Sequence, residues 1–318
     1  MIARRALTII GALAGAALFY WAVRAAGVPD ILQGIQRVGW GLLVILALGG
    51  LRFALRAAGW RLCMPPDTRL TLRQAFGAFV AGDAVGSVTP LGLLASEPTK
   101  VLLIRHHLAT RGAAASLAVE NLVYAASVAA MVAAGLVVML ATVPLPAAWR
   151  WVAVAGLGAA AIGAVVVVRV MRGTWDLSRG PRPRWRERLA AVRATALEFT
   201  VGHPARLWRV FALHLGFHVL AIVDVYLTLW WVLDAAPTLA QAIIFEALNR
   251  VITVGFKFVP FRIGVDEASS GALATLLAMD PAVGVAQALV RKVRNLFWAG
   301  VGLAVVAAHP ARTESTPV

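Results

Sequence analysis

Apolar residues dominate long stretches of the chain, and polar residues gather in the shorter segments between them. The apolar stretches lie at about residues 7–23, 40–58, 113–143, 151–171, 208–233 and 282–308. Each has at least the ~17 residues that an α-helix needs to cross a bilayer. The pattern predicts an all-α polytopic membrane protein with about six spanning helices in a single transmembrane domain, residues 1–308. The first stretch is longer than the apolar core of a signal peptide, so we expect an uncleaved helix there.

Two further apolar blocks are interrupted by proline and acidic residues. Both begin with Thr-Leu-x-Gln-Ala, at residues 71–75 and 238–242, and both then show Pro, six residues and Glu. A proline leaves helix backbone groups without partners, and in hydrocarbon such groups must face protein or a wet cavity. The blocks are therefore predicted to be two re-entrant (broken) helical hairpins. Their predicted turn residues are Pro90, Gly92, Pro260 and Gly264.

The two blocks belong to units that repeat in the chain, at about residues 71–143 and 238–308. Three predicted spans separate the blocks, and this odd number brings the second block in from the opposite face of the membrane. The sequence therefore predicts an inverted repeat. In transporters with this symmetry the working site lies at the interface of the repeats, near the middle of the bilayer.

The composition supports a membrane location and suggests an orientation. Hydrophobic residues make up 60% of the chain and charged residues 14%, with a net charge of +15, whereas soluble domains have about 25% charged residues. The basic residues flank apolar runs, so nucleic acid is not an expected partner. They are concentrated in segments that would lie on one side, above all in a basic loop at residues 172–206. The positive-inside rule then places both termini in the cytoplasm of a plasma (inner) membrane, with a disordered tail at residues 309–318.

Several ionisable residues fall inside the apolar stretches, where each costs at least ~2.5–3.5 kcal/mol and is a functional candidate. An arginine offers a phosphate group two parallel hydrogen bonds, so an anionic lipid headgroup is the expected ligand. The candidate substrate-binding residues are Arg52, Glu97, Lys100, Glu120, Arg250, Glu267, Arg291, Lys292 and Arg294.

Simpler roles for some of these residues stay open. Glu97 and Glu267 are placed to be helix N-caps, and Glu246 and Arg250, four residues apart, to neutralise each other. The basic residues at 291–294 could also reach headgroups nonspecifically near the outer interface.

Repeat symmetry suggests a specific pairing in the membrane. Glu120 and Arg291 lie at corresponding depths in the two units, so they are a candidate buried ion pair. Arg56 stands near the end of its span and could extend to the interface. Arg52 lies deeper, and we expect it to face a cavity.

Metal, cofactor and catalytic residues are not predicted. Cys63 is a single cysteine, and His214 and His218 have the i, i+4 spacing of metal ligands without a third ligand on their face. No nucleophile motif, phosphate-binding loop or dinucleotide fingerprint occurs in the sequence.

The two turns resemble a known family. The segments Pro90-x-Gly92…Glu97-x-x-Lys100 and Pro260…Gly264-Val265-x-Glu267 are similar to those of the flippase-like membrane region of lysylphosphatidylglycerol synthases (the MprF type), and the resemblance covers about residues 7–308. It implies the movement or handling of anionic or aminoacylated phospholipids, and stand-alone relatives occur in hopanoid and glycolipid settings. Leu93-Leu94 stands where many relatives have a Gly-Gly pair, and no soluble aminoacyl-transfer domain is present, so synthase activity is not implied.

The favoured function is therefore a lipid transporter or flippase-like carrier for an anionic or aminoacylated phospholipid or a related polar lipid. Two alternatives stay open. One is a membrane-embedded lipid-modifying transferase with Glu97 or Glu267 as acid or base, so enzymatic activity is not settled. The other is an accessory subunit of lipid biosynthesis. A homo-oligomer or an association with a lipid-synthesis partner is also left open.

Overall fold

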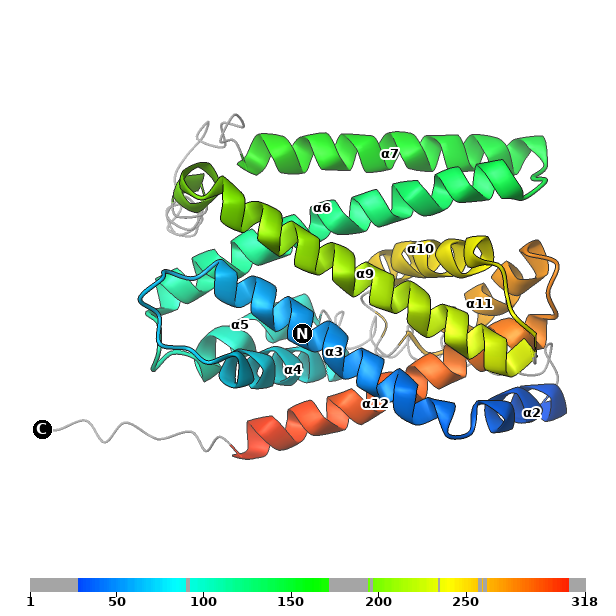
Figure 1. Cartoon of the computed structure of the whole chain (residues 1–318), viewed down its shortest axis with the longest axis horizontal. Coiled ribbons are helices and arrows are strands. Elements are labelled where there is room, and N and C mark those ends of the chain that lie inside the picture. The colour runs from blue at the N-terminus through cyan, green and yellow to red at the C-terminus, as the bar shows by residue number, and fades with distance from the viewer. Residues whose placement is uncertain are drawn as a thin grey trace, which may run out of the picture.

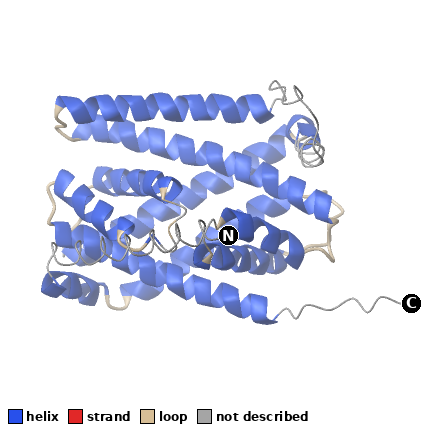
Figure 2. Cartoon of the chain, turned by 180° about the vertical axis from the view of Figure 1, so that it is seen from behind, coloured by secondary structure: helices blue, strands red, loops and turns tan. Residues whose placement is uncertain are grey.

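A computed structural model describes residues 28–89, 92–171, 194, 197–233, 235–256, 259 and 262–308, which are helices and connecting turns without a strand. The predicted first span, Pro90, Pro260, residues 172–193 of the basic loop and the tail lie outside the described residues. The described part confirms an all-α polytopic fold (Figure 2).

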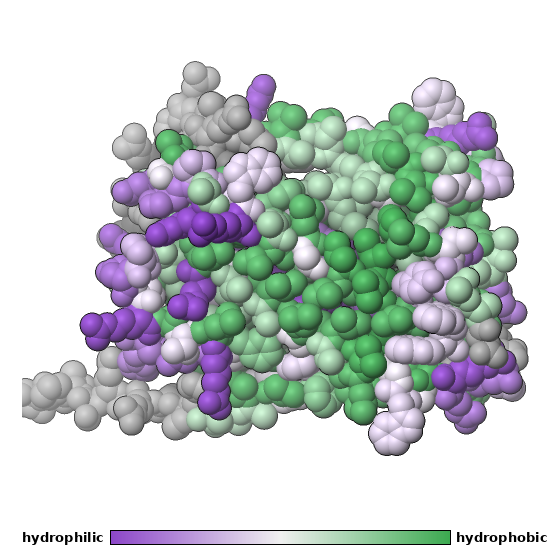
Figure 3. All heavy atoms as spheres, in the orientation of Figure 1, coloured by the Kyte–Doolittle hydropathy of each residue, from purple (hydrophilic) through white to green (hydrophobic). Residues whose placement is uncertain are grey.

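Four of the described helices are long and apolar enough to cross a membrane. They are α3 (Gly41–Leu62), α6 (Thr110–Thr142), α7 (Ala147–Met171) and α9 (Pro204–Leu233). Within α7 the candidate span is Ala147–Val166. Helix α12 (Pro281–Ala308) has 28 residues, which gives a length of about 42 Å, but it carries three basic residues in its first half. The long helices run across a hydrophobic band that separates two more polar ends (Figures 1 and 3). Such a band is typical of a protein surrounded by lipid.

Between the long helices lie two helical hairpins, α4–α5 (Leu72–Val88 and Leu93–Leu103) and α10–α11 (Leu239–Gly255 and Val265–Leu276). The threonine before α4 and the threonine before α10 form the same capping box with a glutamine three residues later. The first hairpin begins and ends at the end of the molecule where α3 ends, and the second does so at the opposite end (Figure 1). The two hairpins are therefore inverted relative to each other, as the sequence predicts.

The two halves pack reciprocally: α4 lies against α12, α10 lies against α6, and α3 lies against α9. Glycine makes both hairpin contacts close. A side chain at Gly135 of α6 would collide with Ala247 of α10, and one at Gly302 of α12 would collide with the backbone at Val80 of α4. The interval from Val80 to Ala247 equals the interval between the two capping threonines, and so does the interval from Gly135 to Gly302. The same crossing is thus built twice, by the small residues that close helix packing in membranes requires.

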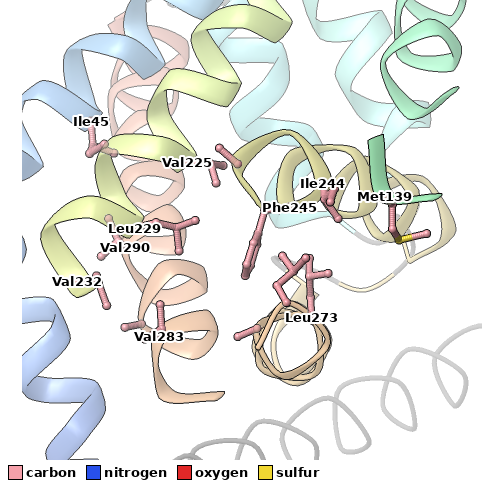
Figure 4. Close-up of a cluster of buried hydrophobic side chains, with 14 of the residues drawn as sticks. Ile45, Met139, Val225, Leu229, Val232, Ile244, Phe245, Leu273, Val283 and Val290 are labelled. Atoms are coloured by element: carbon pink, nitrogen blue, oxygen red, sulfur yellow. The ribbon is translucent and has the colours of Figure 1, made fainter. Parts of the chain in front are cut away.

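The largest hydrophobic core cluster lies between α3, α6, α9, α10, α11 and α12 (Figure 4). Ile45, Leu229 and Phe245 are fully or almost fully buried in it. The amphipathic helix α2 (Val28–Val38) packs across α9 and α12, and Arg37 Nη1 donates a hydrogen bond to the carbonyl of Val232 at 3.1 Å. This core holds the second hairpin against the long helices and leaves the space beside both hairpin tips for the site.

Candidate functional site

A cavity of about 1180 Å³ lies between the two hairpins and the helices α3, α6, α7 and α12. Its size exceeds the range of about 300–1,000 Å³ that is usual for small-molecule pockets. Basic side chains gather on one part of its wall: Arg52, Arg56, Lys100, Arg250, Arg262, Arg291 and Arg294. Two carboxylates, Asp83 and Glu97, line the cavity with them.

Arg52 of α3 and Arg294 of α12 share one carboxylate on α9. Arg52 Nη1 lies 3.4 Å from Asp224 Oδ2, and Arg294 Nη1 contacts the same oxygen. All three side chains are buried, and the Nε atom of Arg52 has no acceptor in the described part of the chain. Two guanidinium groups therefore share one contacting carboxylate at this point.

Arg291 shares its carboxylate in the same way. Arg262 Nε donates to Asp266 Oδ1 at 2.9 Å, whereas Arg291 Nη2 lies 3.8 Å from Asp266 Oδ2 and 3.4 Å from Ser270 Oγ. Arg291 is only 5% exposed. Its Nε and Nη1 atoms find no acceptor among the described residues. Buried donors are usually satisfied, so Arg291 is less well compensated than Arg250, and it lines the cavity as well.

The two hairpin glutamates have different environments. Glu267 is fully buried, accepts a hydrogen bond from the backbone N–H of Gly264 at 2.8 Å, and contacts Lys292 Nζ. Gly264 has a φ of 82°, a left-handed conformation that favours glycine. Glu267 is therefore an N-terminal cap of α11, and neither it nor Lys292 lines the cavity.

Glu97, in contrast, does line the cavity. Its oxygens accept hydrogen bonds from Lys100 Nζ at 3.0 Å and from Asn121 Nδ2 at 3.1 Å. Helix α5 begins after Gly92 without a side-chain cap, so the interpretation of Glu97 as an N-cap is wrong. About a quarter (26%) of the Glu97 side chain is exposed, which leaves the carboxylate accessible from the cavity.

The predicted pair of Glu120 with Arg291 is also wrong. Glu120 binds Arg56, with Nε–Oε1 and Nη2–Oε2 distances of 2.8 Å each, and His214 Nε2 lies 3.5 Å away. The Arg56 guanidinium stacks on the ring of Tyr124 at 3.7 Å instead of extending to the interface. Glu120 is fully buried and does not line the cavity.

The predicted pairing of Glu246 with Arg250 is confirmed. Arg250 Nε donates to Glu246 Oε1 at 2.6 Å, and Arg250 Nη1 donates to the hydroxyl of Tyr124 at 3.3 Å. Arg250 nevertheless lines the cavity, with its carboxylate partner behind it. The arrangement resembles that around Asp224 and Asp266, where the acids also stand outside the cavity wall.

With this geometry established, the sequence comparisons identify the family. The family model of the lysylphosphatidylglycerol synthase TM region matches residues 8–303. The chain belongs to this family. The match covers every described helix that lines the cavity and both hairpins. No curated protein and no solved structure matches the chain.

This member of the lysylphosphatidylglycerol synthase TM family is thus a multi-pass membrane protein of a lipid-related family. Its site contains residues that sequence reasoning missed, namely Asp224, Asp266, Arg56 and Tyr124. The rule that an ionisable residue in an apolar span is a functional candidate would have found Asp224 and Arg56. Asp266 precedes the hairpin glutamate directly, and Tyr124 follows Glu120 by one helical turn.

Proposed function

We propose that the chain transports or carries a membrane lipid with an anionic or aminoacylated polar headgroup. The observation that carries this proposal is the group of buried arginines that line the cavity, Arg52, Arg291 and Arg294 among them, while the carboxylates they share stand outside its wall. A phosphate oxygen accepts the charge-assisted hydrogen bonds that these guanidinium groups can donate.

The rest of the cavity wall supports a lipid rather than a soluble anion. Apolar and small residues of α6, α7 and α10 line the same cavity, among them Leu136, Val152 and Val254. A soluble phosphate compound would leave this surface unused, whereas a lipid has a polar and an apolar part. Membership in a family of lipid-related membrane regions agrees with this choice.

The inverted hairpins support movement of the lipid. If each hairpin enters the bilayer from its own face and ends near the middle, the Glu97 carboxylate and the shared arginines lie where neither face has direct access. Reciprocal packing of the two halves then allows either hairpin to open the cavity to its own side. Inverted repeats in transporters work in this way, with the site fixed and the halves rocking around it.

The orientation follows from charge. Arg61, Arg69, Arg73 and Arg111 lie at the end where α3 ends and α6 begins, and a basic end faces the cytoplasm. The first hairpin then opens toward the cytoplasm of the plasma (inner) membrane and the second toward the outside.

Transport is tested in proteoliposomes that contain phosphatidylglycerol with a fluorescent acyl chain. A membrane-impermeant reductant destroys the fluorescence of outer-leaflet lipid, so lipid movement appears as a second phase of fluorescence loss. We expect Arg291→Gln to slow this phase at least several-fold, and Arg111→Gln, an exposed position with the same change of charge, to leave it unchanged. Equal rates for wild type and Arg291→Gln, or a wild-type rate equal to that of protein-free vesicles, would contradict the proposal.

A further inference from the structure

Helix α7 forms an open apolar wall of the cavity. The residues of α7 that line it are mostly small: Ala153, Gly156, Ala159, Ala160 and Gly163. A Cβ atom added at Gly163, or at Gly255 where α10 ends, would meet no other atom within 4 Å. The cavity is therefore unfilled along this side.

The same helix is the least enclosed of the four candidate spans. Only 6% of its apolar window is buried, against 22–39% for α3, α6 and α9. In the described part of the chain α7 packs mainly against α6, and it has no extended packing against α10. Within the described part of the chain only α6 packs extensively against α7, so no described helix closes the space between α7 and α10 on the other side.

We propose that the space between α7 and α10 is a lateral portal of the cavity. An acyl chain of a glycerophospholipid lies along α7 in this portal, and the phosphate of the same lipid lies at Arg291. The inference rests on the proposed function and adds where the chain of the lipid lies and how the lipid enters. Basic and small apolar residues line one continuous cavity, so a molecule whose phosphate reaches Arg291 has its apolar part beside α7.

The length of the groove fits this occupant. Trp149 and Gly163 both line the cavity, and the fourteen-residue step from one position to the other corresponds to about 21 Å of helix. The acyl chains of one leaflet span about half of the ~30 Å hydrocarbon core, or about 15 Å. The groove is therefore long enough to hold one acyl chain of a glycerophospholipid.

Gly163 and Gly158 provide a matched pair for a test. Both are on α7 and both have open space around their Cα atoms, but Gly158 does not line the cavity. We would replace each with the photoreactive residue p-benzoylphenylalanine and reconstitute the protein in phosphatidylcholine vesicles with a minority of phosphatidylglycerol. The crosslinked lipid is then identified by mass spectrometry.

We expect position 163 to capture phosphatidylglycerol several-fold above its share of the vesicle lipid, and Arg291→Gln to abolish this enrichment. Position 158 should capture lipids in proportion to the bulk composition. Bulk proportions at position 163 would overturn the portal, and an enrichment that survives Arg291→Gln would overturn the link between groove and headgroup site.

A transport measurement separates failure of this inference from failure of the proposed function. Gly163→Leu places an apolar side chain at a position where the added Cβ atom has open space, and it should slow phosphatidylglycerol movement several-fold, whereas Gly158→Leu should not. If Gly163→Leu transports at the wild-type rate while Arg291→Gln is slow, the acyl-chain groove is wrong and the headgroup site stands. If wild type itself moves no lipid, the proposed function fails.

Discussion

Replacing Glu120 with Leu would leave the Arg56 guanidinium in the protein interior without its bidentate acceptor. Arg56 donates two hydrogen bonds of 2.8 Å to Glu120, and only 13% of its side chain is exposed. Removing one partner of a buried ion pair costs about 3–5 kcal/mol, because the remaining charge is uncompensated. We expect Glu120→Leu and Arg56→Met each to lower the free energy of unfolding by about this amount.

The double variant distinguishes a compensated pair from two separate contributions. When well-packed apolar residues replace both members of a buried pair, the change is often neutral or stabilising. Arg56 also stacks on Tyr124 and Phe79, and losing these two cation–π contacts costs about 1–4 kcal/mol in total. The double variant should therefore be no less stable than either single variant. If the cation–π contacts are weak, it should recover most of the free energy of unfolding that each single variant loses.

The free energies can be measured by titrating micelle-reconstituted protein with dodecyl sulfate and following helix content by circular dichroism. Leu and Met are both good helix formers, so helix propensity contributes little to the difference. Additive losses in the double variant would refute the reasoning, because they would mean that neither charge depends on the other.

Three further predictions concern the hairpins and their packing. Cysteines introduced at Gln74 and Gln241, in a background without the native cysteine, should react with an impermeant maleimide from opposite sides of the membrane; labelling from one side would contradict the inverted repeat. Gly302→Ala should lower the free energy of unfolding by about 1–3 kcal/mol through overpacking against α4, whereas Gly300→Ala, which has open space around it, should be neutral or slightly stabilising by the same titration. Glu267→Gln should lower thermal stability, because it removes the negative charge that pairs with Lys292 and weakens the cap of α11; an unchanged melting temperature would argue against both contacts.

The sequence was sufficient to predict the helices, the hairpins and their inverted arrangement, because these follow from apolar length, proline positions and the parity of the spans. It also identified most of the basic residues of the cavity, since charges are costly in apolar segments. The rule selected Arg52, Arg250, Arg291 and Arg294, and all four line the cavity.

Partners of the charged residues could not be predicted by repeat symmetry. By the interval that relates the two capping threonines, Glu120 of α6 corresponds to Gln287 of α12, one helical turn before Arg291. The helices α6 and α12 also do not pack closely within the described chain. Each packs against the broken helix of the other repeat. Arg56 reaches Glu120 from α3, a helix that the sequence comparison of the two blocks did not include.

The roles of the two hairpin glutamates depended on details that a pattern of Pro, six residues and Glu does not contain. Glu267 lies three residues after a glycine with positive φ and caps the helix, whereas Glu97 lies farther inside α5 and turns to Lys100 and Asn121. The difference arises from where each return helix begins. Equal spacing from proline therefore did not imply equal chemistry.

The central claim is that the shared arginines bind the phosphate of a membrane lipid. It is tested most directly by quantifying the lipids that remain on detergent-purified protein, with wild type, Arg291→Gln and Arg111→Gln prepared in parallel. We predict that wild type and Arg111→Gln retain phosphate-bearing anionic lipid well above its share of the membrane and that Arg291→Gln does not. The same lipid composition on all three proteins, equal to that of the bulk membrane, would contradict the account.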